Sequence, residues 1–158
     1  MRSRGRPASS RWSRLARSVE LATAAEASWV AATAGASLAS LEVRHGDPHG
    51  AADLYRWLLP LWSRNGDTSV VWTAMRSIAS LLHLTGDREG AASVLSAVRS
   101  TASGHELYGA DIERLDALES SLRAEMTGDA FEAATRKGRG LEVVELTTLV
   151  LRSLARSG

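Results

Sequence analysis

Four polar residues near the middle of the chain have side chains that could hold a carboxylate or a phosphate. They are Thr73, Arg76, Ser80 and His83. Arg76 is the central one, because its guanidinium presents a planar fork of donors that binds such anions through two hydrogen bonds. A set of apolar residues recurs at helical spacing and predicts a core stripe on a different face: Val71, Met75, Ile78 and Leu82. The polar set therefore either binds a partner or is a solvated surface.

The chain offers little else that could do chemistry. His45 and His49 are four residues apart, a spacing that on one helix would suit a metal ion. The sequence Gly-Asp-Pro between them predicts a turn, so the two imidazoles should not share a face. Cysteine is absent, which excludes disulfides and thiolate chemistry, and no nucleophile stands beside a base and an orienting group. We expect a protein that is not an enzyme and needs no cofactor or metal.

Basic residues are concentrated at the N-terminus. The first 17 residues hold six arginines and no acid, which leaves 13 basic and 18 acidic residues, a formal charge of −5, in the rest of the chain. Several of these arginines could contact nucleic-acid phosphates: Arg2, Arg4, Arg6, Arg11 and Arg14. Disorder without a specific role is the more common outcome for such a terminus, so we interpret residues 1–10 as a disordered leader. The leader lacks the apolar run of a secretory signal, and no stretch of the chain has membrane-spanning length, so we expect a cytoplasmic protein with no membrane contact.

A repeated dipeptide predicts the elements that position these residues. Gly-Asp occurs at 46–47, 66–67 and 86–87, spaced by 20 residues, and again at 128–129. Glycine can adopt the left-handed conformation that ends a helix, and aspartate accepts the free N–H groups that begin the next one. Each dipeptide therefore predicts a tight turn between antiparallel helices. The predicted helices are 11–25, 28–45, 48–64, 68–84, 88–100, 111–126, 130–137 and 141–155.

Local features add detail to three of these helices. Pro60 should kink or shorten the helix 48–64, because proline has no amide hydrogen to donate. Asp129 and Glu132 match a capping box at the start of 130–137. Acidic residues in 111–126 recur at helical spacing and predict a solvated face offset by two arginines: Glu113, Asp116 and Glu119, with Arg114 and Arg123.

Five tryptophans are many for a chain with only 5% aromatic residues: Trp12, Trp29, Trp57, Trp62 and Trp72. We expect them to pack between helical hairpins, with stacking on a ligand as the alternative. Trp57 and Trp62 are five residues apart across Pro60, a spacing that places them on different faces of one helix.

The chain also contains an internal repeat of 40 residues. Residues 33–52 read TAGASLASLEVRHGDPHGAA and residues 73–92 read TAMRSIASLLHLTGDREGAA, with eleven of 20 positions identical. A period of 40 corresponds to one helical hairpin.

This repeat resembles the tetratricopeptide class. Small residues stand at the class's positions of close helix approach, and bulky ones at its large position: Ala39, Ala79, Ala51 and Ala91, then Tyr55 and Leu95. The class's early tryptophan is replaced by Gly35 and Met75. The resemblance implies an all-α, tetratricopeptide-like α-solenoid of antiparallel helical hairpins at 11–105, with 106–158 packing as a helical cap. It also implies that Thr73, Arg76, Ser80 and His83 line a concave partner-binding groove.

A wider resemblance covers residues 28–155. The strings SLASLEVRHGDPHGAADLYRWLLPLWSRNGD, VWTAMRSIASLLHLTGDREGAASVL, LYGADIERL and MTGDAFEAATRKGRGLEVVEL are similar to the C-terminal helical repeats of large actinobacterial signal-transduction ATPases. Those transcriptional regulators often carry a LuxR-type helix-turn-helix. The chain has no G-x-x-x-x-G-K-[ST] motif and no recognisable helix-turn-helix.

The resemblance to regulators implies a protein–protein interaction module, the sensor or scaffold arm of such a regulator or a remnant of one. A protein is the expected partner. The resemblance also implies that upstream repeats of the family have been lost. Their loss would leave one side of helix 28–45 under-covered, which predicts self-association through this N-terminal edge. The residues concerned are Trp29, Val30, Leu38 and Leu41. A nucleic-acid-binding accessory protein that uses the arginine-rich leader is the alternative function.

Overall fold

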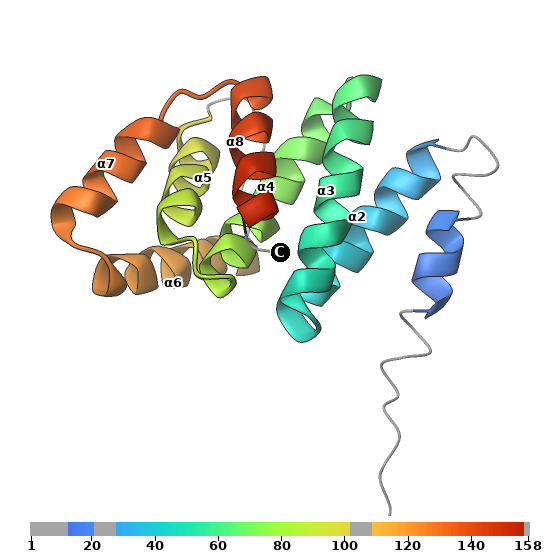
Figure 1. Ribbon diagram of the computed structural model, residues 1–158, viewed down its shortest axis with the longest axis horizontal. Helices are drawn as coiled ribbons and strands as arrows, with labels where there is room; N and C mark the ends of the chain where they lie inside the picture. The colour runs from blue at the N-terminus through green and yellow to red at the C-terminus, as the bar shows by residue number, and fades with distance from the viewer. Residues whose placement is uncertain (1–12, 21–27, 102–108, 157–158) are drawn as a thin grey trace, which may run out of the picture.

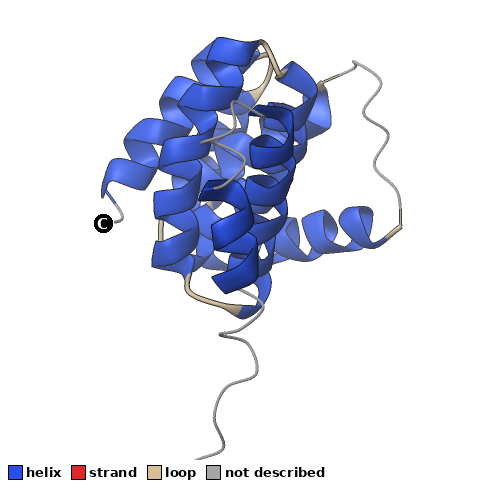
Figure 2. Ribbon diagram, turned by 90° about the vertical axis from the view of Figure 1, so that its right-hand side faces the viewer, coloured by secondary structure: helices blue, strands red, loops and turns tan. Residues whose placement is uncertain are grey.

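A computed structural model describes residues 13–20, 28–101 and 109–156, and every regular element in these ranges is a helix. Residues 13–20 are helical and are followed by seven longer helices (Figure 1). Those helices are α2 (Ser28–His45), α3 (Pro48–Asn65), α4 (Thr68–Leu84), α5 (Arg88–Ser100), α6 (Ala110–Glu125), α7 (Gly128–Gly138) and α8 (Val143–Arg156). Figure 2 shows only helices and their connections in the described part of the chain. The predicted all-helical class is confirmed.

The Gly-Asp dipeptides form the turns for two physical reasons. Gly66 and Gly86 have φ angles of 73° and 89°, in the left-handed region that favours glycine. Asp47 and Asp87 accept hydrogen bonds of 2.9 Å from the amides of the next helix, a cap worth about 1 kcal/mol. Asp67 makes no such side-chain bond. The prediction of a helix break at each of these three dipeptides is confirmed, although the caps are not uniform.

The predicted capping box at the fourth dipeptide is wrong. Thr127 caps α7 instead, because its hydroxyl oxygen accepts the amide hydrogen of Ala130 at 3.3 Å. The helix therefore begins at Gly128, and Asp129 lies inside its first turn. Asp129 still favours the helix there, because a negative charge near the N-terminus interacts well with the helix dipole.

Of the two effects expected of Pro60, a kink or a shortening, the shortening does not occur. α3 runs through Pro60 to Asn65. Proline removes one amide donor, but the residues around it hold this turn in the core, since Leu58, Leu59 and Trp62 are fully buried. Packing of these side chains offsets the missing hydrogen bond.

α4 is the central helix, in contact with α2, α3, α5, α6 and α8. The stripe predicted from helical spacing is buried on it, with Val71, Met75, Ile78 and Leu82 all at 2% exposure or less. Burial of each such side chain contributes about 1.5–3 kcal/mol. α2, α4 and α6 contact one another in succession, and α7 packs along α5. α8 lies across α4 and also contacts α3 and α5 (Figure 1).

The tryptophans divide between core and surface. Trp62 and Trp72 are buried, whereas Trp57 is 44% exposed. The expected packing of the tryptophans between hairpins is therefore wrong for Trp57, which lies on a different face of α3 from Trp62. The indole nitrogen of Trp62 has no hydrogen-bond partner among the described residues. Trp12 and the side chain of Trp29 lie outside the described part of the structure.

Candidate functional site

Three of the four predicted partner-binding residues line one groove. This α2/α4/α6 groove is shallow, with a volume of about 300 Å³, and Arg76, Ser80 and His83 of α4 are part of its wall. Thr73 is exposed but does not line the groove, and its hydroxyl donates to the Ser69 carbonyl oxygen of its own helix at 2.9 Å. The structure therefore brings Arg76, Ser80 and His83 together in one groove and leaves Thr73 outside it.

Arg76 already holds a carboxylate, and that carboxylate belongs to α6. Its Nη1 donates to Oδ2 of Asp111 at 3.1 Å, and the Arg76 side chain is only 18% exposed. Arg114 binds the other oxygen of the same carboxylate. Asp111 thus lies between two guanidinium groups from two helices. This pairing could not be read from the sequence, because it depends on how α6 is placed against α4 after the connection at 101–109.

The groove is positively charged over an apolar floor. Its charged lining consists of Arg44, Arg76 and Arg114 against the single acid Asp111, a formal charge of +2 with histidine neutral. Arg44 donates to a main-chain oxygen at 3.3 Å and has no acidic partner among the described residues. The apolar part comes from Val43, Leu84, Leu115 and Leu118. A surface of this kind can attract an acidic segment and also bury an apolar side chain of it.

His83 belongs to a clamp at one end of the groove. Its Nε2 lies 2.9 Å from Oε1 of Glu125 in α6, and Nε of Arg88 in α5 donates to Oε2 of the same carboxylate at 2.6 Å. These hydrogen bonds, first from His83 and then from Arg88, lower the pKa of Glu125. The clamp ties three helices together and keeps the groove wall in place.

The acidic face of α6 makes ion pairs with α5 and is not only a solvated surface. Arg99 of α5 pairs with Asp116 at 2.5 Å and with Glu119 at 3.4 Å. Arg123 pairs with Glu119 at 2.9 Å and lies 4.3 Å above the Phe131 ring of α7. The expectation of a solvated face holds for Asp116, which is 60% exposed although it is paired with Arg99, and is corrected for Glu119, which is half-buried between Arg99 and Arg123. Glu113 is exposed, as expected.

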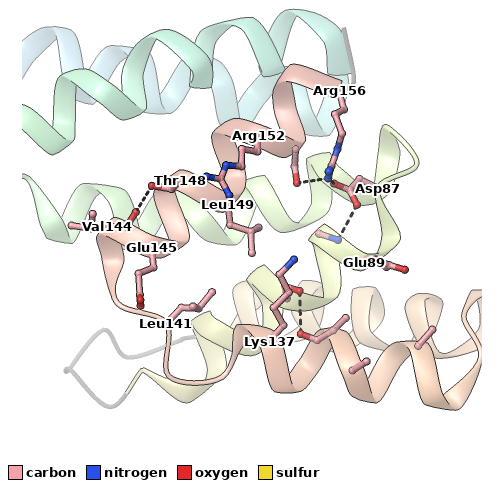
Figure 3. A pocket seen from close by; sticks show the side chains of 16 residues that line it. Asp87, Glu89, Lys137, Leu141, Val144, Glu145, Thr148, Leu149, Arg152 and Arg156 are labelled. Carbon is pink, nitrogen blue, oxygen red and sulfur yellow. Dashed lines mark hydrogen bonds and ion pairs between the residues drawn. The ribbon is translucent and has the colours of Figure 1, made fainter.

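A second and larger cavity was not expected from the sequence. It lies between α5, α7 and α8, has a volume of about 670 Å³, and is called here the α5/α7/α8 pocket (Figure 3). Its basic residues are Lys137, Arg152 and Arg156. The only sequence signal was Lys137, the single lysine of the chain.

The remaining predicted sites are placed only in part. Arg14 is exposed in the helical segment 13–20, whereas the other predicted nucleic-acid contacts, Arg2, Arg4, Arg6 and Arg11, lie outside the described residues. His45 and His49 are both exposed, on either side of the turn that separates α2 from α3. Within the described ranges no three histidine or acidic side chains are grouped so that they could hold a metal ion. No helix in those ranges has the length and apolar character needed to cross a membrane.

Comparison with protein-family models, with curated proteins and with solved structures finds no match for this chain. The features that bear on function are therefore the α2/α4/α6 groove, the α5/α7/α8 pocket and the resemblance of the repeat.

Proposed function

We propose that this chain is a non-enzymatic, tetratricopeptide-like α-solenoid that binds an acidic segment of a partner protein in the α2/α4/α6 groove. The observation that carries the proposal is the groove's composition: three arginines and one aspartate surround an apolar floor. Groups of one charge sign on a recessed surface guide an oppositely charged partner and select against the wrong one.

The packing of the repeat supports the solenoid part of the proposal. The small residues at the positions of close approach are all fully buried, and Tyr55 and Leu95 at the bulky position are at 3% exposure or less. α2 contacts α4 and α4 contacts α6, one helix from each successive hairpin, while α5 contacts α7 from the next hairpin. In a solenoid each unit buries its apolar face against its neighbours in this way. With the resemblance to signal-transduction ATPase regulators, this supports the sensor or scaffold arm of such a regulator as the biological setting.

The groove binds its partner by exchange of carboxylates. A glutamate or aspartate of the partner takes the place of Asp111 on Arg76, and Arg44 supplies a second positive charge that no acid of the described chain neutralises. Because Arg76 is mostly shielded from water, its bond to a partner carboxylate is worth about 1.5–3 kcal/mol. An apolar side chain next to that carboxylate covers Leu84, which is 56% exposed.

The test is fluorescence anisotropy with a labelled peptide that contains several glutamates and one leucine. The matched probe has glutamine in place of each glutamate. We expect the acidic peptide to bind, the glutamine peptide to bind much more weakly, and added salt to weaken the acidic complex. Absence of binding by the acidic peptide, or equal binding of the two peptides, contradicts the proposal.

Arg44→Glu is the informative variant, because it changes the groove charge without breaking an ion pair that holds the fold. Arg64 is its matched control, since it is also an arginine in the last turn of a helix but lies outside the groove. We expect Arg44→Glu to weaken peptide binding about tenfold and Arg64→Glu to leave it nearly unchanged. Arg76→Glu should abolish binding. Equal losses for Arg44→Glu and Arg64→Glu would mean that only the overall charge matters and would refute the groove assignment.

Self-association through the N-terminal edge remains a separate prediction. Val30 of α2 is 45% exposed, whereas Leu38 is buried and Leu41 is half-buried. Val30→Asp should therefore lower the mass measured by analytical ultracentrifugation if this edge pairs two chains. A wild-type protein that sediments as a monomer at all concentrations would contradict the prediction.

A further inference from the structure

The α5/α7/α8 pocket exists because two helices diverge from a shared support. α7 and α8 both pack on α5, yet the close helix contacts of α8 are with α3, α4 and α5 and not with α7. The turn between α7 and α8 contains Gly140 with a φ angle of 78°, a left-handed conformation that redirects the chain. The facing surfaces carry small residues, including Gly90 and Ser93 on α5 and Ala133 and Ala134 on α7. The space between them is therefore not filled by side chains.

The size of the pocket is that of a small-ligand site. Its volume of about 670 Å³ falls within the range of roughly 300–1,000 Å³ that is typical of such sites. One wall is aliphatic and is formed by Leu141, Val144 and Leu149. Val144 is 72% exposed, the most exposed of the large apolar side chains in the described part of the chain. Figure 3 shows Leu149 and Leu141 directed into the space between α7 and α8.

The charges of the pocket are unequally engaged. Asp87 caps α5 at 2.9 Å and pairs with Arg156 at 3.2 Å, and Glu145 accepts the amide hydrogen of Glu142 at 3.0 Å. Lys137 and Arg152, in contrast, have no hydrogen bond or ion pair to any residue that the structure describes.

Glu89 is the one acid of the pocket without a partner among the described residues, and in Figure 3 it points away from Lys137. It also lies in the first turn of α5, where the helix dipole favours a negative charge. The formal charges of the lining cancel, with Lys137, Arg152 and Arg156 against Asp87, Glu89 and Glu145. The two cations without a described partner nevertheless come from opposite walls, Lys137 from α7 and Arg152 from α8.

We propose that the α5/α7/α8 pocket binds a small amphipathic carboxylate. Its single anionic head lies between Lys137 and Arg152, and its aliphatic body covers Leu141, Val144 and Leu149. A head with one negative charge can be held by these two cations, whereas a polyanion would be repelled by the acids of the same pocket, Asp87, Glu89 and Glu145. The bound molecule bridges α7 and α8, the two helices that otherwise contact each other little. This site shares no residue with the α2/α4/α6 groove and does not depend on the proposed peptide binding.

The probe is decanoate, used below the concentration at which it forms micelles and measured by isothermal titration calorimetry on the full chain. Decanol tests the aliphatic body without the charge, and acetate tests the charge without the body. We expect decanoate to bind at one site per chain, with decanol weaker by about tenfold or more and acetate undetectable. If decanoate does not bind, or if decanol binds as tightly, the proposal is wrong.

Four variants locate the site. Lys137→Gln and Arg152→Gln each remove one cation and should weaken decanoate binding about tenfold. Ala133→Phe fills the cavity from an exposed position on α7 and should abolish binding without affecting the charges. The control is Arg136→Gln, one residue before Lys137, because Arg136 does not line the pocket and faces Glu132 at 3.9 Å. An equal effect of Arg136→Gln and Lys137→Gln, or unchanged binding in Ala133→Phe, would place decanoate elsewhere and overturn the assignment.

Discussion

Gly138→Ala should destabilise the protein even though alanine is the better helix former. Gly138 is the last residue of α7 and is buried against α5. A Cβ atom at this position would overlap the main-chain carbonyl oxygen of Ser93. A main-chain oxygen cannot rotate away as a flexible side chain can, so α5 and α7 must separate.

The separation has consequences that can be estimated from the contacts. The hydroxyls of Ser93 and Ser96 donate to main-chain oxygens of α7 at 3.0 and 2.8 Å, and each bond is worth about 1 kcal/mol net. Forcing extra volume into a packed contact costs about 1–3 kcal/mol. The helix propensity of alanine opposes this with about 1 kcal/mol. The clash therefore dominates, and we expect a net loss of about 2 kcal/mol in the free energy of unfolding.

Gly50→Ala is the matched control, since it makes the same substitution in another helix. A Cβ atom at Gly50 would lie 3.5 Å from the nearest atom, Oδ2 of Asp47, which is ordinary van der Waals contact. Only the propensity gain remains there, so this variant should be more stable than the wild type by about 0.5–1 kcal/mol. Urea unfolding followed by circular dichroism at the helix band measures both. If Gly138→Ala is as stable as Gly50→Ala, the close packing of α5 on α7 is refuted.

Two further predictions concern a helix cap and an ionised clamp. Asp87→Ala should lower the free energy of unfolding by about 1 kcal/mol, because it removes a cap hydrogen bond. Asp67→Ala, at the equivalent turn without such a bond, should have a clearly smaller effect in the same urea experiment. Equal effects of the two variants would contradict the difference between the caps. His83 and Arg88 lower the pKa of Glu125 below its ordinary value of 4.5. The ionised carboxylate therefore stabilises the folded protein above pH 4.5, and this contribution is lost as the pH falls through the lowered pKa of Glu125. The melting temperatures of the wild type and of Glu125→Gln should therefore differ near neutral pH and converge in acid, and a difference that persists at low pH would argue against the clamp.

The local features of the fold were predictable because their causes are local. The ends of α2, α3 and α4 follow from Gly-Asp turns whose geometry depends on a few neighbouring residues, and the buried stripe of α4 follows from its spacing. The start of α7 was mispredicted because Thr127, two residues before Asp129, takes the capping role. The predicted helix 48–64 does span Pro60, and the shortening considered there does not occur because tertiary packing, which propensity does not describe, holds that turn.

The sites were predictable only where one helix determines them. Arg76, Ser80 and His83 share a face of α4, so their place along one groove could be inferred from spacing. Their partners Asp111 and Glu125 are 35 and 42 residues away from Arg76 and His83, and no periodicity connects them. The α5/α7/α8 pocket depends on the angle between α7 and α8, which the glycine-containing turn at 139–142 leaves open in the sequence.

The central claim is that Asp111 occupies the place of a partner's carboxylate in the α2/α4/α6 groove. Its most direct test is the affinity of the acidic peptide for Asp111→Asn, which keeps the shape of the side chain and removes its negative charge. We predict severalfold tighter binding, with a steeper dependence on salt, because Arg76 and Arg114 are then free to bind the peptide. Unchanged or weaker binding in Asp111→Asn would contradict the account.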